Sequence, residues 1–386
     1  MRDVVILGST GSIGTQALEV ISTRGDQFNV VALTAGGANL ELLAEQACRF
    51  RPRFVGVATD EAATELAAML ADTGIEVAGA GANERAAAMS CDVVLNGITG
   101  AAGLLATLTT LKAGTTLALA NKESLVIGGR LVTDAAAPGQ IVAVDSEHSA
   151  LAQSLRAGRR EEVRRLILTA SGGPFRGRTR AELAGVTPEQ ALAHPTWTMG
   201  RVVTVNSATL VNKGLELIEA ALLYGVDYDA ITVVVHPTSD VHSMVEFTDG
   251  ATIAQASPPD MRLPIALGLS WPDRVADVTP SYDWSTPRTW MFEPLDSEAF
   301  GAVELARRAG KAAGTAPAVF NAANEICVDA FCAGDLGFLG IVDTVEAVLN
   351  EHLAAGHVPD GSLTLEAVLA ADAWARDRAR QICGVA

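Results

Sequence analysis

The stretch Val4-Val5-Ile6-Leu7-Gly8-Ser9-Thr10-Gly11-Ser12-Ile13-Gly14 decides the fold of the N-terminal part of the chain. Its four apolar residues predict a buried strand, and glycines at every third position follow directly, ahead of a helical stretch. A helix that begins there presents free backbone amides to an anion, as in sites for the pyrophosphate of a dinucleotide. A plain tight turn is the alternative, but a position directly after the first strand of a parallel domain favours dinucleotide binding.

Short apolar runs alternate with alanine-rich helical stretches through the first 149 residues. The runs are apolar throughout, as expected of strands that helices cover on both faces. They therefore predict a doubly wound parallel, Rossmann-like domain over residues 1–149, which the glycine loop marks as a dinucleotide-binding domain. The further strand candidates are Asn29 to Thr34, Phe54 to Val57, Val93 to Leu95, Thr116 to Ala120 and Ile141 to Val144.

The remainder of the chain reads as three parts. Residues 150–272 hold four more β runs, which predict a central α+β domain with an open, mostly antiparallel sheet. An open sheet of this kind often meets a second subunit, or it simply supports a site, so we expect this to be the catalytic and dimerisation domain. Residues 273–297 lack periodicity and suit a connector. Residues 298–386 carry apolar side chains at three- and four-residue spacing, which predicts a helical bundle. The four runs are Leu166 to Ala170, Ile231 to His236, Ser243 to Phe247 and Ala251 to Ala256. The fold class is thus α/β.

Composition excludes several classes of function. The formal net charge of −17 over 386 residues argues against binding to nucleic acid or to an anionic membrane surface. Five scattered cysteines without a CxxC pair suggest neither a disulfide framework nor a zinc site. The N-terminus is no secretory signal, and no apolar run reaches membrane-spanning length. We therefore expect a cytoplasmic protein.

An acidic segment, Asp145-Ser146-Glu147-His148, follows the last strand candidate of the first domain. In a strand, residues two apart face the same side, so the carboxylates of Asp145 and Glu147 are expected to point together into the crevice at the carboxyl end of the sheet. Two like charges this close favour a bound cation, and hard oxygen ligands suit Mg²⁺ or Mn²⁺. An acidic turn without a metal is the alternative for this segment alone.

A second polar cluster lies in the segment from Asn206 to Glu216, where Ser207 or its neighbour can cap a helix. At about 100° per residue, Asn212, Lys213 and Glu216 share one helix face. A Lys and a Glu three residues apart often merely pair in solvent. The many apolar neighbours leave little room for a solvated face. We therefore predict Glu216 as a third metal ligand and Asn212 and Lys213 as phosphate ligands.

Two loops add candidates. Ser171-Gly172-Gly173 follows a predicted strand and offers backbone amides and a hydroxyl to an anion, although it can also be a plain turn. The irregular stretch from His194 to Gly200 contains Trp197 and Met199. It is either a lid over the substrate or a loop anchored by a buried Trp.

Together these segments resemble the 1-deoxy-D-xylulose-5-phosphate reductoisomerase family along nearly the whole chain. Nine motifs in the family's order carry the resemblance: GSTGSIG from Gly8, ANKESLV from Ala120, VDSEHSA from Val144, TASGGPFR from Thr169, HPTWTMG from His194, NSATLVNKGLELIEA from Asn206, HSMVEF from His242, PPDMRLPI from Pro258 and NAANE from Asn321.

The resemblance implies a set of roles. The metal ligands and catalytic carboxylates are Asp145, Glu147 and Glu216, joined in catalysis by Lys122 and His194. The substrate-binding residues are Lys122, Ser146, Glu147, Ser171, His194, Trp197, Met199, Ser207, Asn212, Lys213 and Glu216, with Trp197 and Met199 in a closing lid. The cofactor-binding residues are Thr10, Gly11, Ser12, Ile13, Gly36, Asn39, Asn121, Glu123, Gly200 and Met261.

One departure concerns the cofactor. After the second strand the family often has Lys or Ser before the asparagine, where this chain has Gly37-Ala38 ahead of Asn39. The absence of an acid there favours NADPH over NADH. No basic residue stands in the stretch, so the group that contacts the 2′-phosphate is left open.

The activity that the resemblance implies is the rearrangement and NADPH-dependent reduction of 1-deoxy-D-xylulose 5-phosphate to 2-C-methyl-D-erythritol 4-phosphate, in isoprenoid precursor biosynthesis. It requires Mg²⁺, Mn²⁺ or Co²⁺, and the usual assembly is a homodimer. Two rivals share the glycine loop: a metal-free NAD(P)-dependent dehydrogenase of amino-acid metabolism, and a non-catalytic NADP(H) sensor. Neither needs three convergent carboxylates.

Overall fold

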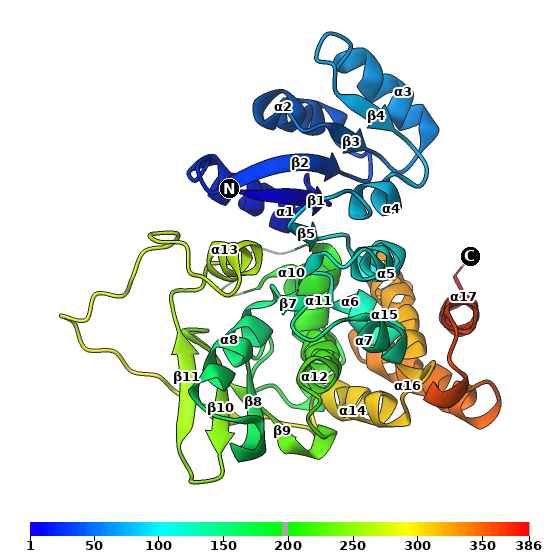
Figure 1. Cartoon of the computed structure of the whole chain (residues 1–386). Helices are drawn as coiled ribbons and strands as arrows, with labels where there is room; N and C mark the ends of the chain where they lie inside the picture. The colour runs from blue at the N-terminus through cyan, green and yellow to red at the C-terminus, as the bar shows by residue number, and fades with distance from the viewer. Residues whose placement is uncertain (195–199, 386) are drawn as a thin grey trace. The chain divides into compact units, whose positions relative to one another are not determined.

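The chain folds into two compact units, seen in a computed structural model that describes residues 1–194 and 200–385 (Figure 1). The first unit comprises Met1–Ser124, Asp134–Ser149 and Asp260–Pro280, and the second comprises Leu125–Thr133, Ala150–Pro259 and Ser281–Ala386. None of the helices in the described ranges is long and apolar enough to cross a bilayer.

The first unit is built on a parallel sheet of seven strands in the order β4-β3-β2-β1-β5-β6-β7. The strands are β1 (Arg2–Leu7), β2 (Phe28–Thr34), β3 (Phe54–Gly56), β4 (Glu76–Ala78), β5 (Val93–Asn96), β6 (Thr116–Leu119) and β7 (Ile141–Ala143). The predicted doubly wound parallel sheet is confirmed. The prediction missed β4, a short and partly exposed strand.

Helices connect the strands of the first sheet. They are α1 (Ser12–Ser22), α2 (Leu40–Phe50), α3 (Asp60–Met69), α4 (Ala82–Ala87) and α5 (Leu104–Lys112), with a short η1 turn (Gly100–Gly103). A further helix, α13 (Arg262–Ser270), returns to this sheet late in the chain. Gly268 permits its approach, because a Cβ there would lie 2.8 Å from a methyl group of Val144. Ile265 and Leu269 are fully buried in the same core.

The second unit holds a five-stranded sheet in the order β11-β10-β8-β9-β12. Its strands are β8 (Val163–Ala170), β9 (Ile231–Val235), β10 (Val241–Phe247), β11 (Thr252–Ala256) and β12 (Glu293–Pro294). Consecutive strands are not all neighbours, since β8 lies between β9 and β10. β8 and β9 are parallel, whereas the other pairs are antiparallel, so the predicted mostly antiparallel sheet is confirmed.

Helices of the second unit pack into one large apolar core. They are α9 (Arg180–Leu183), α10 (Pro188–Leu192), α11 (Arg201–Thr209), α12 (Val211–Tyr224), α14 (Ala302–Ala312), α15 (Ala316–Ala333), α16 (Phe338–Ala355) and α17 (Leu365–Cys383); η2 (Leu155–Ala157), η3 (Arg160–Glu162), η4 (Tyr228–Ala230) and η5 (Asp360–Ser362) are single turns. Figure 1 shows α12 beside α14, and α15 packs against α11, α16 and α17. The predicted C-terminal helices are therefore present.

Three helices have residues in both units, because the chain passes from one unit to the other within them: α6 (Lys122–Gly128), α7 (Arg130–Ala135) and α8 (Ser146–Ser154). The division groups residues 260–280 with the first unit and the C-terminal helices with the second sheet. The predicted functional boundaries near residues 149, 272 and 297 stay predictions.

Candidate functional site

The glycine loop follows β1 as predicted, and close backbone contacts explain its glycines. Gly8 has φ +83°, and a Cβ there would lie 2.8 Å from the carbonyl oxygen of Gly97. A Cβ at Gly14 would lie 2.3 Å from the carbonyl oxygen of Gly8. Helix α1 begins after Gly11 without a side-chain cap. Because its first amides have no side-chain acceptor at the cap, the loop that carries Thr10, Gly11, Ser12 and Ile13 fits an anionic pyrophosphate.

The loop after β2 is open to solvent at Gly36, Ala38 and Asn39. The Oδ1 atom of Asn39 accepts a hydrogen bond from the amide of Leu42 at 3.0 Å, so this side chain caps α2. Gly37 has φ +103°, and a Cβ there would lie 3.3 Å from the Cβ of Ala62. These contacts hold the loop at the carboxyl edge of the sheet, where a dinucleotide binds in such folds.

Asn121 joins the loops after β5 and β6. Its side chain is 2% exposed. Its Oδ1 accepts from the amide of Ser124 at 2.8 Å, and its Nδ2 donates to the carbonyl of Gly100 at 2.9 Å. The turn places Lys122 and Glu123 at the start of α6. Hydrogen bonds at both ends of the amide therefore fix the orientation of Asn121.

Lys122 forms a nearly buried ion pair with Asp145, and their side chains are 10% and 12% exposed. The two residues follow the neighbouring strands β6 and β7. Burial by itself would raise the pKa of Asp145. The positive charge of Lys122, the nearby His148 and a hydrogen bond with Glu147 outweigh burial and hold that pKa well below its usual range. Asp145 is therefore an anion at neutral pH.

Glu147 lies in the first turn of α8, not in a strand, so the predicted strand alternation is wrong here. Strand β7 ends at Ala143, and helix α8 (Ser146–Ser154) begins at Ser146. Even so, carboxylate oxygens of Asp145 and Glu147 lie within 4.8 Å of each other. Ser146 Oγ donates to Glu147 Oε2 at 2.6 Å. The turn from strand to helix thus brings the two acids together by a different geometry.

In the second unit, the glycine turn after β8 meets the last turn of α11. Ser171 Oγ lies 3.2 Å from His194 Nε2 and accepts from the amide of Gly173 at 3.2 Å. A Cβ at Gly173 would lie 2.8 Å from the carbonyl oxygen of Ser207. Burial lowers the pKa of His194, so its imidazole is uncharged at neutral pH. Three predicted substrate residues, Ser171, His194 and Ser207, therefore gather in one place.

Ser207 does not cap a helix, as the sequence suggested it could. It lies inside α11, and Leu210, at φ +62°, separates α11 from α12. Helix α12 then carries the second polar cluster. Asn212 Nδ2 donates to Glu216 Oε1 at 2.5 Å, and Lys213 donates to the other carboxylate oxygen.

The side chains of Lys213 and Glu216 are only 4% and 1% exposed. The Lys213–Glu216 ion pair is therefore buried and does not lie in solvent. The predicted shared helix face of Asn212, Lys213 and Glu216 is confirmed. A buried carboxylate held by two donors is costly to place in a core, which points to a role in binding or catalysis.

The other predicted residues are placed as follows. Gly200 is the residue before α11, and Met261 precedes α13 and packs partly against the core of the first unit. Trp197 and Met199 lie outside the described residues. The sequence reasoning missed the pairing of Lys122 with Asp145, although their positions after adjacent strands were a usable signal.

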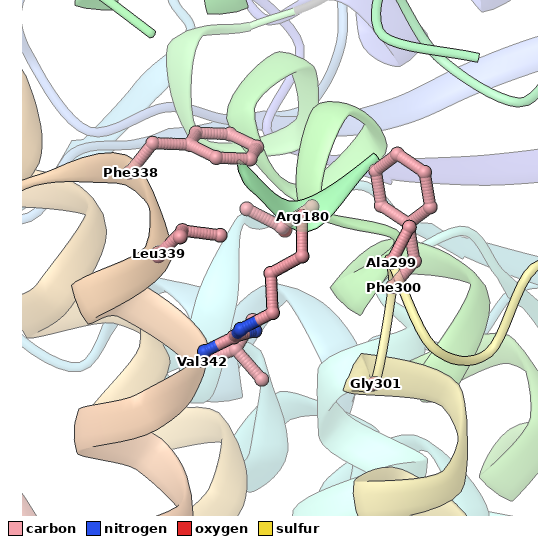
Figure 2. A pocket seen from close by; sticks show the side chains of 8 residues that line it. Arg180, Ala299, Phe300, Gly301, Phe338, Leu339 and Val342 are labelled. Atoms are coloured by element: carbon pink, nitrogen blue, oxygen red, sulfur yellow. The ribbon is translucent and has the colours of Figure 1, made fainter. Parts of the chain in front are cut away.

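A separate small pocket, partly open to solvent, lies in the second unit. Figure 2 shows the Arg180 side chain crossing it, between Phe338 and Leu339 on one side and Phe300 on the other. The Arg180 guanidinium is bound to both carboxylate oxygens of Asp343, at 2.7 and 2.9 Å. None of the predicted site residues lines this pocket.

A substitution at Gly173 tests whether the contact between the glycine turn after β8 and α11 is needed for substrate binding. Gly173→Ala is expected to raise KM about tenfold for the phosphorylated substrate that the sequence predicts, because the methyl group must displace the backbone of Ser207 and φ +65° disfavours alanine. Steady-state kinetics measure this effect. Gly177→Ala is the matched control, since Gly177 also has a positive φ, +81°, but has open space around it. Equal effects of the two changes would mean that backbone strain alone is responsible.

Comparisons with known proteins cover nearly the whole chain. Family models described as 1-deoxy-D-xylulose 5-phosphate reductoisomerase, its C-terminal domain and the DXP reductoisomerase C-terminal domain match residues 4–129, 141–224 and 256–378. The 1-deoxy-D-xylulose 5-phosphate reductoisomerase of Cutibacterium acnes is 67% identical over 99% of this chain and 98% of its own length. That of Streptomyces coelicolor is 59% identical over 99% and 92%.

Solved structures of reductoisomerases are also similar to this chain over nearly its whole length. The reductoisomerase from Zymomonas mobilis in complex with NADPH is 42% identical, with a TM-score of 0.91 over 99% of each chain. A DOX-P reductoisomerase in complex with NADPH, fosmidomycin and magnesium is 33% identical, with a TM-score of 0.93 over 100% of this chain and 98% of that one.

Proposed function

Because the chain belongs to the 1-deoxy-D-xylulose 5-phosphate reductoisomerase family, we propose that it converts 1-deoxy-D-xylulose 5-phosphate into 2-C-methyl-D-erythritol 4-phosphate. The family resemblance carried by the nine motifs is confirmed. The observation that carries the proposal is 67% identity to a curated relative over 99% of the chain. The enzyme is an NADPH-dependent oxidoreductase, and nothing in these similarities favours the metal-free dehydrogenase or the sensor.

NADPH would occupy the carboxyl edge of the first sheet. The loop that carries Thr10, Gly11, Ser12 and Ile13 would bind the pyrophosphate through the free amides of α1. The adenosine end would lie over the loop after β2, and the nicotinamide end near α6 and α13. The remaining proposed cofactor residues are Gly36, Asn39, Asn121, Glu123, Gly200 and Met261.

A divalent metal ion would be held by Asp145 and Glu147, with Glu216 as the proposed third ligand. The fit rests on two close carboxylates in the first unit and a buried carboxylate in the second. Oxygen donors of this kind suit Mg²⁺ and Mn²⁺, and the solved relatives include complexes with magnesium. Lys213 and Asn212 orient the Glu216 carboxylate, and Lys122 keeps Asp145 ionised.

The substrate's phosphate would be bound by Ser171, Ser207, Asn212 and Lys213. The hydroxyls and the glycine amides supply neutral donors, and the ammonium supplies charge. His194, uncharged at neutral pH and beside Ser171, can hold a substrate hydroxyl or accept its proton. Lys122 and Ser146 would contact the sugar near the metal. Trp197 and Met199 remain proposed lid residues that exclude water.

When bound, the metal ion would supply Lewis-acid stabilisation of negative charge on the sugar oxygens, and NADPH would supply the hydride for the final reduction. The protein groups provide orientation and charge. Phosphate contacts far from the reacting carbons contribute binding energy that positions the carbon skeleton. We further propose that the protein is cytoplasmic and forms a homodimer. Light scattering of the purified protein tests the dimer, because it measures the molar mass in solution.

The decisive experiment follows NADPH absorbance with 1-deoxy-D-xylulose 5-phosphate as substrate, in the presence of Mg²⁺ or Mn²⁺. We expect steady oxidation that stops on addition of excess EDTA and resumes when metal is restored. Oxidation that is indifferent to EDTA would contradict the metal site. No oxidation with any metal would contradict the proposed reaction itself.

A further inference from the structure

We propose that Asn324, which no part of the proposed mechanism uses, is a positioning residue for the phosphate site and acts through Asn206. The inference rests on the proposed function, because it assigns Ser207 and its neighbours to phosphate binding. Asn324 lies in the NAANE motif on α15, and Asn206 lies on α11, directly before Ser207. The two helices are far apart in the sequence and pack together in the second unit.

A single hydrogen bond joins the two amides. Asn324 Nδ2 donates to Asn206 Oδ1 at 2.9 Å, and the side chains are almost completely buried, with 0% and 3% exposure. A hydrogen bond between two buried amides is directional, since each group accepts few alternative geometries. The contact therefore fixes the rotation of the α11 turn that carries Asn206.

Stability alone does not explain Asn324. Its Oδ1 atom is buried and has no hydrogen-bond partner among the described residues. A buried carbonyl left without a partner destabilises a fold, and an apolar side chain of similar shape would avoid that cost. Asn324 therefore weakens the core and at the same time directs its amide nitrogen toward α11. We infer that its role is to set the geometry of α11.

Asn206 lies in the turn of α11 that contacts the glycine turn after β8, which carries Ser171 and Gly173. The Ser207 carbonyl packs directly against Gly173 and accepts from the amide of Leu210 at 3.2 Å. Thr209 Oγ1 accepts from the amide of Val211 at 3.3 Å, which links this turn to the start of α12. A rotation of α11 would therefore move Ser207 relative to Gly173 and tilt the first turn of α12, which carries Asn212 and Lys213.

The test replaces Asn324 by Leu, which keeps the volume and removes the donor. We expect KM for 1-deoxy-D-xylulose 5-phosphate, and the inhibition constant of inorganic phosphate as competitor, to rise together by about tenfold. The KM for NADPH and kcat should stay within about twofold, and the melting temperature should be unchanged or higher because the orphan carbonyl is gone. Asn206→Ala should reproduce the effect, and the double variant should be no worse than either single one.

Asn321→Leu is the matched control. Asn321 lies one turn earlier on the same helix and is 1% exposed, but among the described residues its side chain donates within α15, to Glu325 Oε1 at 2.9 Å. It should leave phosphate inhibition unchanged. Asn324→Leu with a lower melting temperature and unchanged phosphate inhibition would overturn the proposal, and so would additive effects of the two single variants. If Asn324→Leu does not fold, Asn206→Ala decides by the same criteria. Failure of the unmodified enzyme to turn over substrate would instead overturn the proposed function.

Discussion

Replacement of Asp145 by Asn is expected to lower kcat by about 1,000-fold or more, which corresponds to about 4 kcal/mol of lost transition-state stabilisation. The change removes a proposed metal ligand while keeping its shape. It also leaves the nearly buried Lys122 beside a neutral amide. Breaking a buried pair in this way costs about 3–5 kcal/mol where burial is complete, and less here, where the side chains are 10% and 12% exposed.

The measurement is kcat at saturating substrate and NADPH across a series of Mg²⁺ concentrations, together with direct Mn²⁺ binding. Loss of Mn²⁺ affinity together with loss of kcat would support the ligand role. Glu161→Gln is a suitable control, because Glu161 is a 69% exposed carboxylate paired with Arg159 at the surface. Activity of Asp145→Asn within tenfold of the unmodified enzyme would mean that Asp145 does not hold the metal.

A change of Gly14 to Ala is expected to raise KM for NADPH about 100-fold. The added Cβ would lie 2.3 Å from the Gly8 carbonyl oxygen and 2.5 Å from the Cα of Ser9, and both neighbours are backbone atoms that cannot rotate away. The loop must therefore open, which misaligns the amides that would bind the pyrophosphate. Overpacking of this kind also destabilises the fold by about 1–3 kcal/mol.

NADPH binding by fluorescence titration measures the effect without relying on turnover. Gly25→Ala is the control in the same unit, because a Cβ at Gly25 meets nothing within 4 Å. Metal binding should be unaffected in both variants. Unchanged NADPH affinity in Gly14→Ala would show that the glycine loop serves only as a turn.

Local patterns were enough to predict much of the fold. The apolar runs of the first unit became parallel strands, and the three-residue glycine spacing became a strand-to-helix turn. The polar face of α12 also followed from helical periodicity, with Asn212, Lys213 and Glu216 on one side. These features depend on residues close in sequence, whose relative directions the backbone geometry sets.

The failures have a common physical origin. Strand alternation predicted the orientation of Glu147, but this residue lies on a helix. Strand β7 ends at Ala143 and α8 begins at Ser146, so the alternation does not extend to Glu147. Ser207 was considered as a cap but lies inside α11, because the break falls at Leu210, a bulky residue with positive φ. Packing with distant segments decides such boundaries, and short-range propensity is too weak to override it.

The sequence by itself thus determined the two kinds of sheet, the dinucleotide loop, the family and the residue types available for chemistry. Only the tertiary structure decided that Lys122 pairs with Asp145, that the Lys213–Glu216 pair is buried, that Gly173 contacts Ser207, and that Asn324 holds Asn206. The reason is that a periodic pattern specifies which face of an element a side chain occupies. What lies opposite that face, and how much water remains there, depends on elements brought together from far along the chain.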